Sequence, residues 1–289
     1  RVWGKAQAAA EIEKKAELTI DAQTVDASPQ TTQRVLNMTF AEVAARMGPM
    51  IYEGKATFDL RRNGRGFEIV EKTKIEQGLN DSWHLTQRDA KDNLLREVFY
   101  YNGLYALRNG PGKLRAAGSL NAKTGISRDE AYEPLSTYTK YYGKRLGLSK
   151  QGTESVAGRS AVRYDFVLLD GPEFIEVKGM KGKKKPVERA GGVWVDTNTG
   201  AVIKAKLKGR FEIPAAKEGG KPGSLKLGLQ GEARTVEGRQ ILPEKEPVAT
   251  IERHPVDLDP LEFLDGGTRT STVIGGKKKK KKAALDAGK

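Results

Sequence analysis

The stretch that decides the fold runs from Gly192 to Ile213 and reads GVWVDTNTGAVIKAKLKGRFEI. From Ile203 onward apolar residues alternate with charged ones, which is the period of a strand with one buried and one solvated face. The four residues before Ala201, Thr-Asn-Thr-Gly, are typical of a tight turn. The stretch therefore predicts a hairpin between residues 192–196 and 201–213.

The same alternation recurs on both sides of this hairpin. It is clear in residues 51–61 and 67–76, which flank the turn sequence Asn63-Gly64. Further strands are predicted near residues 83–87, 94–101, 104–108, 162–168, 174–178 and 225–233. The connections are too short for crossovers, so we expect one strongly curved antiparallel sheet that is covered on one side.

Two helices are predicted to provide that cover. Thr39-x-x-Glu42 is a capping box, and Gly48-Pro49 ends the helix that follows it. The second helix is predicted from Ala131 to Leu148, where apolar residues recur every three or four positions. The covering residues are expected to be Phe40, Val43, Met47, Leu135, Tyr138 and Tyr142.

The ends of the chain differ in composition from its centre. Residues 1–31 include a charged stretch and a segment rich in Gln, Thr and Ser, and we expect a flexible leader there. Residues 32–264 are expected to form the folded domain, of mainly β (α+β) class. Residues 265–289 are expected to form a disordered lysine-rich tail.

The composition excludes several kinds of chemistry. The chain of 289 residues has no cysteine and two histidines, so it has no disulfide, no thiolate metal site and no cysteine nucleophile. No lipase-type serine motif, Walker A loop, zinc-protease motif or EF-hand loop occurs. The sequence therefore predicts a protein that is not an enzyme and has no catalytic residue, no metal and no cofactor.

Much of the net charge of +14 comes from two short lysine clusters. One spans residues 181–185, and the other consists of Lys277, Lys278, Lys279, Lys280, Lys281 and Lys282. Clustered cations can neutralise phosphates, but no aromatic residue stands beside either cluster to stack on a base. We expect a solvated tail with weak electrostatic contact to an anionic membrane surface. Binding to nucleic acid through the lysines is a less favoured alternative, and no specific nucleic acid is expected.

We expect the strands to present more apolar residues than two helices can cover. One interpretation is an ordinary core, which the residues by themselves favour; the other is an apolar face left free for a ligand. The residues that would line such a cradle are Phe58, Leu60, Phe67, Ile69, Trp83, Phe99, Tyr164, Phe166, Ile203, Leu207 and Phe211.

Three short sequence segments occur in an order that resembles a known family. They are VFYYNGLY at residues 98–105, ESVAGRSAVRY at residues 154–164, and GVWVDTNTG at residues 192–200 followed by Lys204-Ala205-Lys206. From about Thr39 to Ala233 the chain resembles the LolA/LolB/RseB-like half-barrel proteins of the bacterial envelope. The lysine clusters have no counterpart in that family, and no latch arginine can be matched on the strand at residues 52–61.

The resemblance implies a half-barrel whose concave apolar face is covered by helices. It implies work in the periplasm, after removal of a signal peptide before Arg1, as a non-enzymatic carrier of a lipid or lipoprotein acyl chain. An envelope sensing or assembly module of the same fold, which binds a protein partner, is the alternative.

Overall fold

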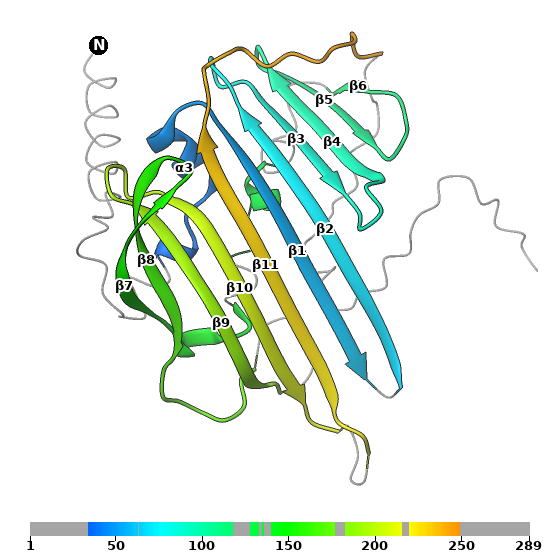
Figure 1. Ribbon diagram of the computed structural model, residues 1–289. Coiled ribbons are helices and arrows are strands. Elements are labelled where there is room, and N and C mark those ends of the chain that lie inside the picture. The colour runs from blue at the N-terminus through cyan, green and yellow to red at the C-terminus, as the bar shows by residue number, and fades with distance from the viewer. Residues whose placement is uncertain are drawn as a thin grey trace, which may run out of the picture. The chain divides into compact units, whose positions relative to one another are not determined.

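The structure is a computed structural model, and it describes residues 34–62, 64–117, 128–132, 135, 140–176, 183–215 and 220–248 (Figure 1). The expected leader, the expected tail and the lysine cluster at residues 277–282 lie outside these ranges. Residues 34–36 form a helical turn, followed by α3, Phe40–Met47. Among the described residues, no helix is long and apolar enough to cross a membrane.

The described strands form one open antiparallel sheet, as predicted. Their bounds are β1 Met50–Arg62, β2 Arg65–Gln77, β3 Trp83–Arg88, β4 Leu94–Tyr101, β5 Leu104–Asn109, β6 Arg115–Ala117, β7 Leu146–Val156, β8 Arg159–Leu168, β9 Lys185–Asp196, β10 Val202–Ile213 and β11 Gly223–Thr235. Their order across the sheet is β6-β5-β4-β3-β2-β1-β11-β10-β9-β8-β7. The first and last strands are thus neighbours at the centre, and β6 and β7 are the two edges.

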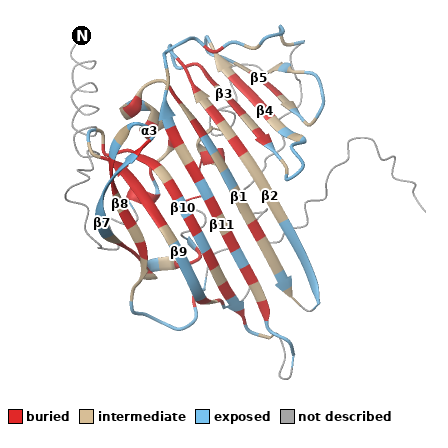
Figure 2. Ribbon diagram, viewed as in Figure 1, coloured by how far each residue is buried: buried red, intermediate tan, exposed pale blue. Residues whose placement is uncertain are grey.

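Hydrogen-bonded register assigns the residues to two faces. Tyr52 pairs with Ala233 on one side and Ile75 on the other, so all three side chains share a face. We call this the inner face, because the ring of Phe40 on α3 lies 6.5 Å from that of Tyr52. The opposite side is the outer face. On β10 and β11, buried inner-face residues alternate with residues that are mostly exposed or half-buried (Figure 2).

The predicted second helix ends earlier than its spacing suggested. Residues 128–132, 135 and 140 are helical, but Gly143 adopts a φ of +56° and a short 3-10 turn, Gly143–Arg145, leads directly into β7. Leu146 and Leu148 are therefore strand residues, paired with Leu168 and Phe166. The strand predicted at residues 174–178 is reduced to a bridge between Ile175 and Lys184, with residues 177–178 outside the described ranges.

Candidate functional site

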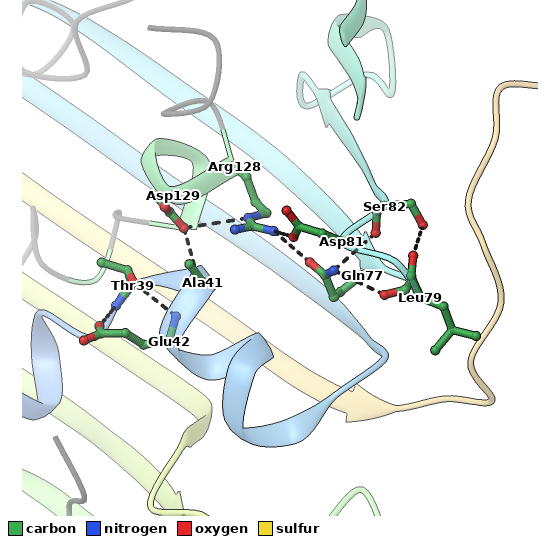
Figure 3. A network of polar contacts seen from close by, with 10 residues as sticks. Thr39, Ala41, Glu42, Gln77, Leu79, Asp81, Ser82, Arg128 and Asp129 are labelled. Atoms are coloured by element: carbon green, nitrogen blue, oxygen red, sulfur yellow. Dashed lines mark hydrogen bonds and ion pairs between the residues drawn. The ribbon is translucent and has the colours of Figure 1, made fainter. Parts of the chain in front are cut away.

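Helix α3 begins with its own capping box and is bonded to the second helical segment, which is described at residues 128–132, 135 and 140. The amide of Glu42 donates to Oγ1 of Thr39, and the amide of Thr39 donates to Oε2 of Glu42, completing the predicted capping box. The amide of Ala41 donates to Oδ1 of Asp129 at 2.9 Å (Figure 3). An orphan N–H of the first turn is thus satisfied by the segment that lies beside the helix.

Arg128 joins the same segment to the sheet. Its guanidinium lies 5.4 Å from the ring centroid of Phe40 and 5.6 Å from that of Trp83. Its Nη1 donates to Oε1 of Gln77 at 2.8 Å, and the carboxylate of Asp81 lies 3.7 Å away (Figure 3). The cation is therefore bound between two aromatic rings and a buried amide, which fixes the segment against β2 and β3.

Tyrosines form most of the described cover over the centre of the sheet. The ring of Tyr132 lies 4.9 Å from that of Tyr52, Tyr141 packs on Phe58 and Phe211, and Tyr142 lies 4.7 Å from Phe211. The hydroxyl of Tyr142 donates to the carbonyl of Glu188 at 2.9 Å. Burial raises the pKa of Tyr52, Tyr132 and Tyr142, so these phenols stay neutral at physiological pH.

Ten of the eleven residues predicted to line the cradle share the inner face. Phe58 pairs with Ile69 and Leu227, Leu60 pairs with Phe67, and Leu207 pairs with Leu229, which in turn faces Ala56. The ten are Phe58, Leu60, Phe67, Ile69, Trp83, Tyr164, Phe166, Ile203, Leu207 and Phe211.

Phe99 lies on the outer face, which corrects its assignment to the cradle. Trp83, an inner-face residue, pairs with Tyr100, so the preceding residue of β4 points the other way. Phe99 pairs with His84 instead, and the two rings stack at 3.9 Å. An error of one residue in the phase of a strand moves a side chain to the opposite face.

The inner face is filled by the protein's own side chains over its centre. Phe58 is 2% exposed, and Leu207 and Phe211 are fully buried. Of the predicted covering residues, Phe40, Val43, Met47, Leu135 and Tyr142 are buried, and the side chain of Tyr138 lies outside the described residues. The cavity beside Tyr52 and Leu229 has a volume of about 10 Å³, which is room for about one water molecule.

The apolar surface reaches solvent at the far end of the hairpin of β1 and β2. Phe67 is 37% exposed and stacks on the buried Phe58 at 5.6 Å, while Leu60 and Ile69 are half-buried. Figure 2 shows this end of β2 as exposed. A continuous apolar path therefore leads from solvent at Phe67 to the covered centre at Phe58.

At one level of β2, β3 and β4 the inner face is polar. Gln87 donates to Oε1 of Glu71 at 2.6 Å, and Arg96 stands opposite Gln87 in the neighbouring strand. Burial lowers the pKa of Arg96, against the opposing attraction of Glu130 and Glu71. Two residues further along these strands the inner face is apolar again, because Ile75, Leu85, Val98 and Leu107 are buried there in register.

A second covered region lies on the outer face of β3 to β5, under residues 239–248, which we call the strap. The amide of Leu79 donates to the carbonyl of Arg239, and the amide of Ile241 donates to Oγ of Ser82, both at 2.9 Å. At the far end the amide of Val248 donates to the carbonyl of Leu114 at 3.0 Å. Between these attachments the strap borders a mixed polar and apolar cavity of about 1000 Å³.

An acid–base group lines this cavity. Nε2 of His84 lies 2.9 Å from Oε1 of Glu97, and Nε of Arg108 donates to the other carboxylate oxygen. Burial by itself would raise the pKa of Glu97, but the hydrogen bonds and charges of His84 and Arg108 outweigh it and hold the pKa below its usual range. The group binds together β3, β4 and β5. The sequence analysis did not identify it, since its members are brought together only by strand register.

Among the described residues, no group of three His, Asp or Glu side chains is arranged to hold a metal ion. The arrangement of the described residues offers surfaces for binding. What it can do chemically is bury apolar groups on one face and hold charged groups on the other.

Comparison with known proteins gives neighbours in structure. No family model and no curated protein matches the chain. The structure of the Pseudomonas aeruginosa MucA/MucB complex matches 68% of this chain at 15% identity with a TM-score of 0.22. The chain spans 56% of that neighbour, little more than half of its length.

Two further neighbours are matched over most of their length. A putative outer membrane lipoprotein-sorting protein domain from Vibrio parahaemolyticus is 12% identical, with 71% of this chain and 92% of that one covered and a TM-score of 0.24. A LolA superfamily protein from Nitrosomonas europaea is 9% identical, with coverages of 72% and 96% and a TM-score of 0.22. These are proteins of the group that the sequence resembles.

Proposed function

We propose that the protein is a non-enzymatic binding protein of the bacterial envelope that shelters the acyl chain of a lipid or lipoprotein on the inner face of its sheet. The observation that carries this proposal is the continuous apolar path from the exposed Phe67 to the buried Phe58. A solvent-exposed phenylalanine that continues a covered apolar face is a place where an apolar ligand can begin to bind. The envelope location rests on the resemblance found in the sequence.

The energetics of an acyl chain suit this face. Each methylene that leaves water contributes about 0.8 kcal/mol, so a chain of a dozen carbons supplies about 10 kcal/mol before the costs of binding. A cavity of about 10 Å³ holds no such chain, so binding requires the cover to move. Tyr141 and Tyr142, which pack on Phe58 and Phe211, are the side chains that an entering chain would displace.

Uptake of a fluorescent fatty acid, dansyl-undecanoic acid, tests the proposal. Phe67→Glu places a charge on the path and should weaken binding at least about tenfold. The matched control is Leu104→Glu, because Leu104 is 49% exposed and lies on the outer face, opposite Tyr101. Saturable uptake that Phe67→Glu abolishes and Leu104→Glu preserves supports the carrier. Absence of saturable uptake in the unaltered protein, or equal loss in both variants, overturns it.

A second candidate is an envelope module that binds an extended segment of a protein partner. It is favoured by the closed centre of the inner face and by strand β7, which within the described chain pairs only with β8. Residues 150–155 of this edge are exposed, and an open edge can add a strand from another protein. A photoreactive residue at Thr153 should then cross-link a partner that one at Leu104 does not reach.

A further inference from the structure

The outer face carries a row of cations that runs across the strands. Lys206 on β10 stands opposite Gln230 on β11, and Gln230 stands opposite Lys55 on β1. Lys55 in turn stands opposite Lys72 on β2, and Lys72 opposite Arg88 on β3. We call Lys206, Gln230, Lys55, Lys72 and Arg88 the basic row. It contains four cations and no carboxylate.

Such a row costs the fold stability. Like charges directly opposite each other on neighbouring strands repel, and here Lys55 faces Lys72 while Lys72 faces Arg88. Within the described residues the relief comes from the turn after β3. There Oδ1 of Asp92 lies 2.8 Å from Nζ of Lys72, and the carbonyl of Asp92 accepts from Nη1 of Arg88. The carboxylate of Asp92 thus pairs with Lys72, and its backbone carbonyl accepts from Arg88.

The neighbouring row shows that this arrangement is not imposed by the sheet. Two residues away along the strands, Lys204 lies 2.8 Å from Glu232, and Glu53 stands opposite Lys74. Glu232 and Glu53 also stand opposite each other, so this row contains two cations and two carboxylates. Pairs of opposite charge are therefore available at the same depth on the same strands. A row of like charges does not stabilise the fold, and such a row is expected where its residues bind another molecule.

The surface at the row is open. A hollow of about 420 Å³ is lined by four cations, Lys55, Lys72, Lys74 and Arg88, and by one carboxylate, Glu53, among others. Lys55, Arg88 and Lys206 are exposed. With neighbouring strands about 4.8 Å apart, the row extends roughly 19 Å from β10 to β3. A line of cations of this length on a solvated sheet face complements an extended anionic surface better than a single small anion.

We propose that the outer face docks on the surface of an anionic phospholipid bilayer through the basic row. Lysine stems lie along the sheet while their ammonium groups reach the lipid phosphates. This goes beyond the acyl-binding function, because it assigns the membrane to the face opposite the one that would hold the chain. It depends on the strands' register and holds whether or not an acyl chain binds.

Co-sedimentation with vesicles tests the docking face in the full-length protein. Vesicles of phosphatidylcholine with 30% phosphatidylglycerol are compared with vesicles of phosphatidylcholine alone. The row variant is Lys55→Gln, Lys72→Gln and Arg88→Gln. The matched control removes the same charge elsewhere, at the exposed Lys113, Lys144 and Lys221, each changed to Gln. A cation near an anionic surface contributes roughly fivefold in affinity, so the row variant should lose at least about tenfold and the control much less.

Three results would overturn the proposal. They are equal loss in the row variant and the control, no preference of the unaltered protein for the anionic vesicles, and full competition by a few millimolar inorganic phosphate, which would indicate a discrete phosphate site. The row variant should unfold at the same temperature as the parent or higher. Its uptake of dansyl-undecanoic acid should be unchanged, so failure of docking and failure of acyl binding are distinguished on one protein.

Discussion

The two faces of this sheet are covered by different means. On the inner face, α3 and the segment around Tyr132, Tyr141 and Tyr142 lay aromatic rings over the centre of the sheet. On the outer face, Ile241 of the strap forms a small cluster with Phe99 and Ala106 of the sheet. The strands from β10 to β2 carry charged side chains there. The difference shows that an apolar residue can be buried on either face, wherever a later segment of the chain covers it.

The inner face should contribute the larger share of stability. Phe211→Ala removes a fully buried ring that packs on Tyr141 and Tyr142, and should lower the free energy of unfolding by about 3–5 kcal/mol. Urea denaturation measures it, with Phe67→Ala as the exposed control. A loss below about 1 kcal/mol for Phe211→Ala would mean that the cover is not packed on the sheet.

The strap should contribute less to the free energy of unfolding than the cover of the inner face does. It is attached to the sheet at two places, near Ile241 and at Val248. Ile241→Ala should cost about 2 kcal/mol, since Ile241 is buried against Phe99. Its neighbour Leu242 is 52% exposed, and Leu242→Ala should stay within about 0.5 kcal/mol. Equal effects of the two substitutions would contradict a strap seated through Ile241.

Under the strap, the carboxylate of Glu97 should make stability depend on pH. Its pKa is held below the usual value, so the carboxylate stabilises the fold above about pH 4.3 and this contribution is lost as the pH falls through the lower folded value. Glu97→Gln should lower the free energy of unfolding by about 1–2 kcal/mol at pH 7, because it weakens the bonds from His84 and Arg108. Denaturation at pH 7 and pH 3 should show the difference narrowing in acid. A constant difference would rule out this titration.

The basic row predicts the smallest effect, and one of opposite sign. Lys55→Glu places a carboxylate opposite Lys72 and should raise the free energy of unfolding by about 0.2–1 kcal/mol. Lys206→Glu should gain less, because Lys206 stands opposite the neutral Gln230. Thermal unfolding at low salt compares the two. Destabilisation by Lys55→Glu would show that the row is compensated within the fold.

Period-two alternation was enough to predict the sheet, most of its strands and the inner position of ten cradle residues. It failed in β4, where Val98, Phe99, Tyr100 and Tyr101 are all apolar or aromatic and the pattern sets no phase. The pairing of Trp83 with Tyr100 sets the phase. Apolar residues on both faces of a strand indicate that other segments cover both faces. The segment that covers the outer face contains Ile241, which lies in a proline-rich stretch without periodicity.

Other features could not be read from local spacing. Leu146 and Leu148 fit both a helix and a strand, and the positive φ of Gly143 decides between them. The contacts of Arg128 with Phe40 and Trp83 join three separate segments. The basic row exists only when five strands are in register, so no single stretch of sequence contains it.

The pairing of β1 with β11 has a consequence for how the chain reaches its fold. Residues from opposite ends of the domain, such as Phe58 and Leu227, must meet along nearly the whole length of both strands. Until β11 has been synthesised, β1 presents a long open edge with an apolar side, and the two halves of the sheet are not joined. Contacts of such sequence separation make folding slow and leave the unfinished chain prone to aggregation. Such a chain folds more efficiently when, during its synthesis, it is kept from pairing with other chains.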